Sequence, residues 1–447
     1  MNTPWIETAC ARVAEAPTFR VCGRVTRVTG QVVEATSIPA AVGEVCRIDP
    51  EERESLLAQV VGFHDGGVLL MPFGELEGIH PRAVVMPLGR EFYASVGEGL
   101  VGRVLDGLGR PIDGGGPIGM TSHRVLSGRR PNPMERTRIH EPLGTGVRAI
   151  DGLLTVGQGQ RIGIMAGSGV GKSVLLGMIA RNTTADVNVI ALLGERGREV
   201  REFIERDLGP EGLRRSVLVV ATGDETPLVR ATGALVATSI AEYFRDLGRN
   251  VLMMMDSVTR VAMAWREIGL SVGEPPTTKG YPPSVFGALP RLLERAGTAR
   301  RGSITGLYTV LVEGDDFSEP IADATRSILD GHIVLSRSLA NARHFPAIDV
   351  LGSISRVRDE VISAAHREAA DTLLKLEAVY RTHEDLIAVG AYKKGTDTEV
   401  DKAIHFRGAM HEFLRQKANE GASSKDVSDH LIGLVTAIRN YKDQDPS

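Results

Sequence analysis

The chain has 447 residues, with 42% hydrophobic and 24% charged side chains, a composition typical of a soluble globular protein with two or three domains. Its formal net charge of −4 argues against general binding to nucleic acid, and no apolar run approaches the roughly 20 residues that span a bilayer. Cys10, Cys22 and Cys46 are too few and too scattered for a disulfide framework or a zinc site, so we expect a reducing, cytoplasmic environment.

The first 92 residues fall into two parts. Residues 1–19 place Ile6, Val13 and Phe19 on a short amphipathic pattern, which fits a docking helix and a disordered arm equally well. Residues 20–92 contain short apolar runs, such as EVCRI, LLAQVVGF and GGVLLMPF, separated by Gly, Pro and Asp. Short strands at regular spacing predict a small β-barrel domain.

In the rest of the chain, the strand-like runs recur at longer intervals. In residues 93–354, strand-like runs such as RIGIMA, VNVIALLG and VLMMMD are separated by helical patterns. This alternation predicts an α/β domain, in which helices cover both faces of a parallel sheet. Residues 355–447 are helix-rich, with a Gly break at VGAYKKGTD, and predict a C-terminal helical domain.

The stretch AGSGVGKS, from Ala166 to Ser173, follows a strand-like run and precedes a helical pattern. It matches the phosphate loop GxxxxGK[ST], with Ala166 in place of the first glycine. The glycines let successive backbone N–H groups point at an anion, and the following helix adds its positive N-terminal end. We expect Lys172 to contact the β- and γ-phosphates of a nucleotide and Ser173 to bind Mg²⁺, whereas a plain Gly-rich turn is the alternative. The predicted nucleotide-binding residues of this loop are Gly167, Ser168, Gly169, Val170, Gly171, Lys172 and Ser173.

Two acidic residues follow other strand-like runs. Asp256 ends VLMMMD, the pattern of a Walker B strand, and Glu195 follows VNVIALLG. Because the carboxyl ends of parallel strands meet at the ligand crevice of such sheets, we expect both carboxylates near the phosphate loop. Asp256 would belong to the metal shell, and Glu195 would activate water for hydrolysis. The alternatives are a helix-capping role for Asp256 and a surface ion pair for Glu195.

Longer motifs indicate a family. AGSGVGKSVLLGMIAR, GERGREVREFI, GYPPSVFGALPRLLERAG and FPAIDVLGSISR resemble the ATPase of bacterial type III protein export, which is related to the α and β subunits of the rotary ATP synthase. The resemblance extends from about Arg20 to about Val435. DLIAVGAYKKGTDTEVDKAI is more similar to the flagellar export ATPase than to the ATPase of virulence injectisomes.

The resemblance implies roles for individual residues. Glu195 matches the catalytic glutamate that polarises the attacking water, a position at which non-catalytic α-type subunits carry Gln. Arg196 matches the adjacent arginine, a candidate γ-phosphate contact, and Asp256 matches the Walker B aspartate that holds Mg²⁺. Arg356, in SISR, matches the arginine finger that a neighbouring subunit contributes. Phe345, in HFPAID, matches the aromatic residue that packs on adenine.

The resemblance also implies a fold and a function. The expected fold is a RecA-like P-loop ATPase core with an N-terminal β-barrel and a C-terminal helical domain. A homohexamer of such chains would hydrolyse ATP with Mg²⁺ to energise flagellar protein export, peripherally at the inner face of the cytoplasmic membrane. The implied partners are an export-gate membrane protein, a stalk protein, a regulator protein and chaperone–substrate complexes, and no nucleic acid.

Several rival functions remain at this point. They are an injectisome ATPase, a catalytic subunit of a rotary ATP synthase, a hexameric RNA translocase and a non-hydrolysing scaffold. The block GYPPSVFGALPRLLERAG favours export over ATP synthesis. Phe63 and Phe73 are isolated in the barrel sequence, whereas RNA-stacking surfaces need clustered aromatics. Glu195 disfavours the scaffold.

Overall fold

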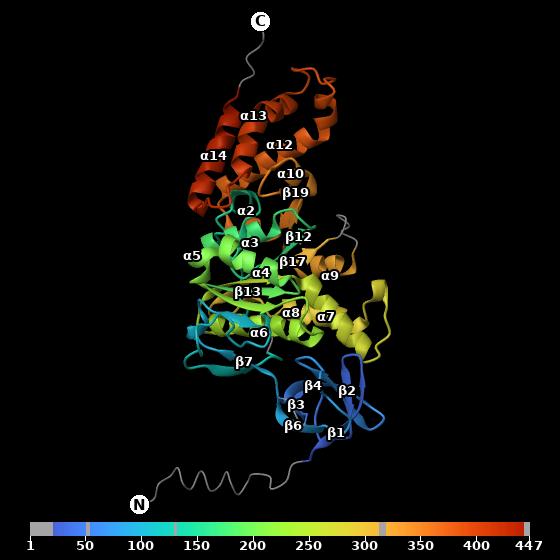
Figure 1. Cartoon of the computed structure of the whole chain (residues 1–447). Coiled ribbons are helices and arrows are strands. Elements are labelled where there is room, and N and C mark those ends of the chain that lie inside the picture. Colours follow the sequence, from blue (N-terminus) through green and yellow to red (C-terminus); the bar gives the residue numbers. More distant parts are fainter. Residues whose placement is uncertain (1–20, 51–53, 129–131, 313–318, 442–447) are drawn as a thin grey trace, which may run out of the picture. The chain divides into compact units, whose positions relative to one another are not determined.

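The computed structural model describes residues 21–50, 54–128, 132–312 and 319–441 (Figure 1). The amphipathic pattern at residues 1–19 lies outside these ranges. The described chain forms two compact units, one ending at Phe92 and including Leu270–Glu274, and one formed by Tyr93–Gly269 and the residues from Pro275 onward. No helix in the described ranges is both long and apolar enough to cross a membrane.

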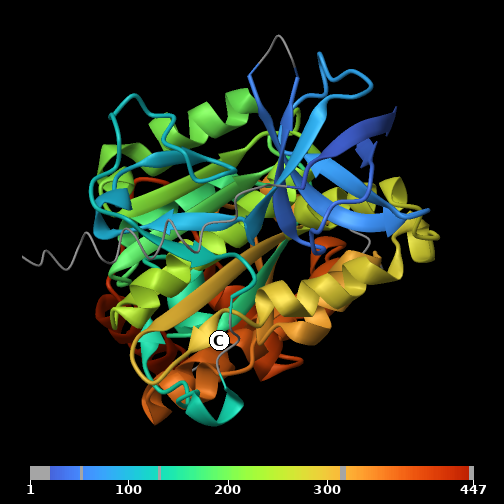
Figure 2. The same cartoon turned by 90° about the horizontal axis from the view of Figure 1, so that it is seen from below.

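The N-terminal unit is a closed barrel with the strand order β1-β2-β5-β4-β3-β6. Figure 2 shows these strands, in blue, curving round to close on themselves. Alternate side chains, including Val33, Ile48 and Leu70, fill the interior. Cys46 is among them, and burial, with a smaller contribution from Glu44, raises the pKa of its thiol to about 12. The strands are β1 Gly23–Thr29, β2 Val32–Ala35, β3 Glu44–Asp49, β4 Leu56–His64, β5 Gly67–Pro72 and β6 Val84–Glu91.

The second unit is built on a sheet with the strand order β19-β18-β12-β17-β15-β13-β14-β8. All neighbours in this order are parallel except β18 and β19, and a short strand, β16 (Gly297–Thr298), adds antiparallel to β17. The central strands are almost entirely apolar because helices cover both faces of the sheet. The strands are β8 Val104–Asp106, β12 Arg161–Ala166, β13 Val187–Leu193, β14 Ser216–Ala221, β15 Asn250–Asp256, β17 Ser303–Leu311, β18 Gly331–Leu335 and β19 Ile348–Ser355.

Helices cover this sheet as the alternating pattern predicts. Figure 1 shows α3 and α4 on one side of β13 and α6 on the other side. Two short ribbons lie outside the sheet, β7 (Tyr93–Val96) with β9 (Ser122–Val125) and β10 (Pro142–Leu143) with β11 (Val156–Gly157). The α-helices are α2 Arg148–Leu153, α3 Lys172–Asn182, α4 Gly197–Glu202, α5 Gly209–Leu213, α6 Pro227–Asp246, α7 Val258–Ser271, α8 Pro283–Leu293, α9 Pro320–Ile328, α10 Arg337–Asn341 and α11 Arg358–Val361. A π-helical segment, Phe203–Leu208, joins α4 to α5, and 3-10 turns occupy Glu98–Leu100, Pro133–Glu135 and Thr278–Gly280.

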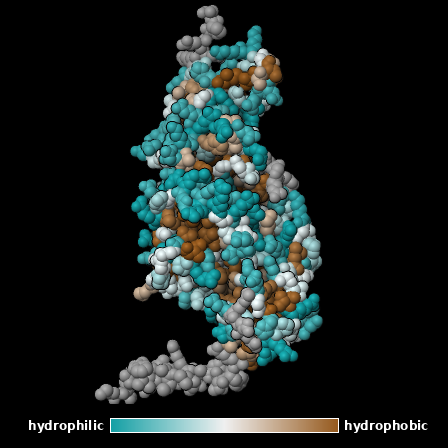
Figure 3. All heavy atoms as spheres, viewed as in Figure 1, coloured by the Kyte–Doolittle hydropathy of each residue, from teal (hydrophilic) through white to brown (hydrophobic). Residues whose placement is uncertain are grey.

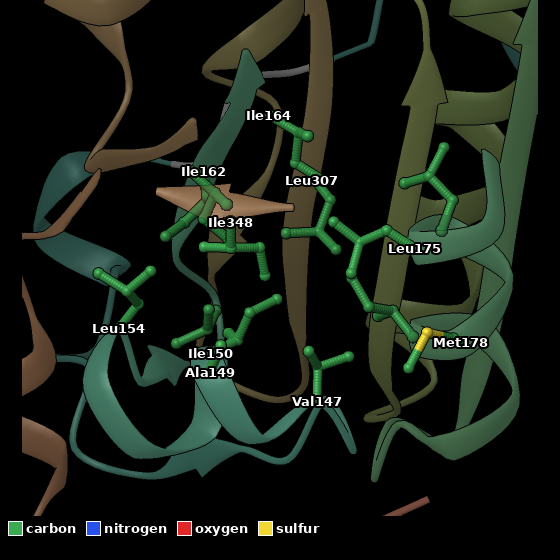
Figure 4. Close-up of a cluster of buried hydrophobic side chains, with 14 of the residues drawn as sticks. Val147, Ala149, Ile150, Leu154, Ile162, Ile164, Leu175, Met178, Leu307 and Ile348 are labelled. Atoms are coloured by element: carbon green, nitrogen blue, oxygen red, sulfur yellow. The ribbon is translucent and has the colours of Figure 1, made fainter. Parts of the chain in front are cut away.

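The chain ends in three longer helices, α12 (Ala364–Ala388), α13 (Thr398–Leu414) and α14 (Ser424–Asn440). Their inner faces belong to the same hydrophobic cluster as α2, α3 and β12, through residues such as Leu373 and Phe413. Figure 4 shows part of this cluster, in which Ile150, Ile162 and Leu175 converge. The predicted barrel, nucleotide-binding sheet and helical domain are therefore confirmed. The boundary expected between residues 354 and 355 stays a prediction.

Candidate active site

The phosphate loop follows β12 at the carboxyl edge of the sheet. Gly169 and Gly171 have φ values of 77° and 90°, in the left-handed region that glycine adopts without strain. Val170 points into the core and is only 2% exposed, so only its backbone is available to a ligand. Because α3 begins at Lys172, the free N–H groups of its first turn and its positive end face the loop.

Lys172 lies between the two predicted carboxylates. Its Nζ donates to Asp256 Oδ1 at 2.5 Å and to Glu195 Oε1 at 3.1 Å. Thr309, on the neighbouring strand β17, donates its hydroxyl to the same Asp256 oxygen at 2.6 Å. Burial by itself would lower the pKa of Lys172, but the charges of Asp256 and Glu195 outweigh it and raise that pKa. The ammonium group therefore stays charged at physiological pH.

A cavity of about 680 Å³ opens beside this ion cluster. Among the predicted residues, those that line it are Gly167, Ser168, Gly169, Gly171, Lys172, Ser173, Glu195 and Arg196. Asp256 lies behind Lys172, and its side chain is 5% exposed. Five cationic and two anionic side chains line the cavity, so its net positive charge suits a polyanion such as a triphosphate. The cationic side chains are Lys172, Arg196, Arg206, Arg260 and Arg337.

Three of these arginines were not identified from the sequence. Arg260, in the first turn of α7, has a buried Nε without a hydrogen-bond partner in the described structure. Arg337 begins α10 directly after β18 and donates to the carbonyl oxygen of Ser168 at 3.3 Å. Arg206 reaches the cavity from the π-helical segment. Arg260 and Arg337 follow strand ends, so the rule that identified Asp256 and Glu195 could have identified them too.

A second cavity, of about 1100 Å³, lies on the other side of the phosphate loop. The Phe345 ring lies 3.6 Å from where a β-carbon on Gly171 would be, so an aromatic face borders the loop. The opposite wall includes His411 of α13 and the segment after it, which contains Gln416. Gln416 donates its backbone N–H to the Phe345 carbonyl oxygen at 3.0 Å. No sequence pattern indicated this wall, because its residues lie in the C-terminal helical region rather than at the end of a strand of the sheet.

The oxygen donors of the site fit a magnesium ion. Ser173 has a hydroxyl in the cavity and Asp256 has a carboxylate beside it, and Mg²⁺ prefers such hard oxygen ligands. Among the described residues, no group of three His, Cys, Asp or Glu side chains could hold a metal alone. A metal here would therefore need phosphate oxygens as further ligands, which is how Mg²⁺ usually binds in nucleotide sites.

Arg356 does not join these residues. It follows β19, its side chain is exposed, and it is not among the described residues that line either cavity. Its backbone N–H donates to the Asp330 carbonyl oxygen at 3.0 Å. The finger role of Arg356 within one subunit's own site therefore has no support, and its role in a neighbour's site stays a prediction.

Comparison with protein families agrees with this organisation. Residues 146–355 match the ATP synthase alpha/beta family, nucleotide-binding domain, and residues 25–89 match the β-barrel domain of that family. Residues 362–433 match the T3SS EscN ATPase C-terminal domain.

Individual relatives cover most of the chain. The chain is 54% identical to the flagellum-specific ATP synthase of Bacillus subtilis, over 93% of this chain and 96% of the relative. It is 52% identical to the type 3 secretion system ATPase of Sinorhizobium fredii, over 97% of this chain and 96% of the relative.

Solved structures show the same fold. The assembled ATPase EscN of the enteropathogenic E. coli type III secretion system superimposes with a TM-score of 0.87 at 46% identity, covering 92% of this chain and all of that one. EscN in complex with its central stalk EscO gives a TM-score of 0.86 at 47% identity, with the same coverage of both chains. The family resemblance of the motifs is thus confirmed: the chain is an ATPase and belongs to the type III and flagellar export ATPases of the ATP synthase α/β family.

Proposed function

We propose that the protein hydrolyses ATP with Mg²⁺ in a homohexameric ring and so energises the export of flagellar proteins. The observation that carries this proposal is the cluster of Lys172, Glu195 and Asp256 at the mouth of the phosphate loop. The cluster supplies a cation for phosphate oxygens, a carboxylate for water and a carboxylate for the metal shell. Ser173 and Asp256 would hold the Mg²⁺, which neutralises phosphate charge when bound.

The loop N–H groups and Lys172 would bind the triphosphate, and the unpartnered Nε of Arg260 offers a further donor. Arg196 is a further candidate contact for the γ-phosphate, since it lines the same cavity. Phe345 would pack on the adenine, since its ring borders the loop from the second cavity.

Glu195 would accept a proton from the attacking water. The water oxygen then bonds to the γ-phosphorus, and the bond from that phosphorus to the bridging oxygen of ADP breaks in line with the attack. Charge develops on the phosphoryl oxygens as this happens, and Arg356 of the neighbouring subunit would neutralise it. A finger of this kind is worth about 10³ to 10⁵ in rate, so the assembled protein should be far more active than the single subunit.

The relatives support the ring and one partner. EscN is described as an assembled ATPase and in complex with a central stalk. In this chain, the end of the hairpin formed by α12 and α13 exposes Leu386, Val389 and Ile404. Figure 3 shows hydrophobic residues gathered at that end, near the top of the view. We assign this surface to a stalk protein, whereas the export gate, the regulator, chaperone-bound substrates and peripheral attachment to the membrane rest on family resemblance alone.

Substitution of Glu195 tests the chemistry. Glu195→Ala should lower turnover by about 10² to 10⁴ because the proton acceptor is lost, and it should leave nucleotide affinity unchanged. Steady-state hydrolysis and the binding of a fluorescent ATP analogue measure the two effects. Glu199→Ala is the matched control, since Glu199 lines the same cavity with a half-exposed side chain. Equal loss of binding in Glu195→Ala would indicate a structural role instead.

A strain that lacks the gene tests the cellular role. The wild-type gene should restore secretion of flagellar filament protein, and the Glu195→Ala gene should not. Restored secretion of injectisome substrates without flagellar export would favour the second candidate, an injectisome ATPase. The observation that favours this second candidate is the match of residues 362–433 to the T3SS EscN ATPase C-terminal domain.

A further inference from the structure

The position of Arg356 is set by its backbone. Its side chain is exposed, and its guanidinium forms no hydrogen bond or ion pair within the described part of the chain. Its N–H donates to the Asp330 carbonyl oxygen at 3.0 Å. Whatever holds Asp330 and the end of β19 therefore determines where the arginine lies.

Asp330 is fixed to the first residue of β12. Its carboxylate accepts from Arg161 Nε at 3.0 Å and from Arg161 Nη2 at 3.1 Å. Its backbone N–H donates to the Arg161 carbonyl oxygen at 2.8 Å. Such two-pronged charged contacts fix geometry as well as distance.

Gln160 and Ser355 join the same cluster from either side. Gln160 is fully buried, and its Nε2 donates to the Asp330 carbonyl oxygen at 3.0 Å and to Ser355 Oγ at 3.1 Å. The Ser355 hydroxyl donates to the Thr155 carbonyl oxygen at 2.8 Å. Ser355 directly precedes Arg356, so its hydroxyl fixes the last residue of β19 against the core.

Close backbone packing completes the arrangement. Gly331 pairs with Ser355 between β18 and β19, and its φ of 150° favours glycine. A β-carbon on Gly331 would overlap the Ile354 carbonyl oxygen and lie 3.1 Å from the Ser355 Cα atom. The strand that leads into Arg356 can lie this close only because a glycine faces it.

We propose that Gln160, Asp330 and Ser355 form a positioning cluster that aims Arg356 at the active site of the neighbouring subunit. The inference rests on the proposed ring. None of the three residues lines either of the two cavities of its own subunit. The phosphate loop lies at the far end of β12, about 17 Å away along its six residues. The cluster should therefore act on the neighbour's site and leave its own subunit's site unchanged.

Mixed rings test this direction. One subunit type carries Glu195→Ala, which inactivates its own site but keeps Arg356. The other carries Arg356→Ala, which keeps an intact site but contributes no finger. Rings of either type alone should be inactive. Mixed rings should recover turnover at interfaces where a Glu195→Ala subunit supplies Arg356 to the intact site of an Arg356→Ala subunit. Ser355→Ala is then added to one subunit type at a time.

On the Glu195→Ala subunit, Ser355→Ala should lower the recovered turnover about 10-fold to 100-fold, since small misplacements of a catalytic group have effects of this size. On the Arg356→Ala subunit it should change nothing. Ser355→Thr, which keeps the hydroxyl, should restore turnover. Ser353→Ala is the matched control, because Ser353 lies on the same strand and bonds to Asp349 and Val334. Binding of an ATP analogue by each variant shows that it is folded.

Three results would overturn the proposal. If Ser355→Ala lowers turnover only on the Arg356→Ala subunit, which supplies the intact site, then Ser355 acts on the phosphate loop of its own subunit. An effect on neither subunit would remove the positioning role. No recovery in the mixture before Ser355 is changed would refute the shared site of the proposed function, and the positioning role with it.

Discussion

At the scale of single residues, the site is organised around one ammonium group. Lys172 contacts two carboxylates that come from different strands, and its side chain is 13% exposed. Asp256 is buried and Glu195 is partly buried, so their negative charges repel each other unless a cation lies between them. Lys172 therefore stabilises the local fold, in addition to the phosphate contact that we propose for it.

Removing this ammonium should destabilise the nucleotide-free protein. Lys172→Ala leaves the buried Asp256 and the partly buried Glu195 without a counter-charge. Loss of one partner from a fully buried pair costs about 3 to 5 kcal/mol, which sets the upper end of the expected destabilisation. Chemical denaturation measures the change. The double variant Lys172→Ala/Glu195→Gln should regain part of the loss, because one of the two charges is gone. A double variant no more stable than the single one would show that charge repulsion is not the cause.

At the scale of elements, the sequence predicted the strands and strand-end residues that local patterns specify. The apolar runs identified β12, β13 and β15, and the strand-end rule brought Glu195 and Asp256 to the phosphate loop, where the structure has them. The wall formed by Gln416 could not be predicted, because Gln416 contacts Phe345 from a position 71 residues further along the chain and no local pattern signals that contact. The ion pair between Asp330 and Arg161 forms because the starts of β12 and β18 lie side by side. No sequence pattern specifies which strands become neighbours.

The segment between α10 and β19 should respond to acid. Burial, the nearby His411 and the cationic Arg415 and Arg407 lower the pKa of His344 to about 4 from its usual 6.5, and its Nδ1 has no partner in the described structure. Between these values the unfolded chain takes up a proton that the folded chain does not. Stability should therefore fall as pH falls below 6.5, by at most about 1.4 kcal/mol per unit from this residue.

His344→Gln tests this, because glutamine cannot take up the proton. The free energy of unfolding, measured from pH 7 down to pH 5, should fall less steeply in the variant than in the wild type. Parallel curves would show that His344 does not titrate differently in the folded and unfolded chains.

The hairpin of α12 and α13 provides a second prediction at this scale. Val389 is 76% exposed at the end of α12, so an aspartate there can be solvated in the free protein. Val389→Asp should abolish stimulation of hydrolysis by a stalk protein and leave unstimulated turnover unchanged. Val42→Asp, at an exposed valine of the barrel unit, is the control. Undiminished stimulation of Val389→Asp would exclude this hairpin as the stalk surface.

At the scale of the whole molecule, activity should depend on assembly. The only finger candidate indicated by the family motifs, Arg356, lies outside the cavities of its own subunit. Turnover per subunit should therefore rise with protein concentration as rings form. In Arg356→Ala this rise should be lost, with turnover about 10³ to 10⁵ lower in the assembled state.

Hydrolysis assays run alongside analytical ultracentrifugation at matched concentrations measure this dependence. At dilutions where the wild type is monomeric, wild type and Arg356→Ala should be equally slow. A variant that is slower than the wild type in the monomeric state would mean that Arg356 acts within its own subunit.

Helix α13 runs from the second cavity, which Phe345 lines, to the exposed end of the hairpin. Its 17 residues begin at Thr398, near that end, and finish at Leu414, beside the His411 wall. At 1.5 Å per residue the helix is about 25 Å long, so a tilt of about 5° at the cavity would swing its far end by about 2 Å. If a nucleotide base tilts α13 slightly at the cavity, the length of the helix would turn that tilt into a larger displacement of the exposed hydrophobic end of the hairpin.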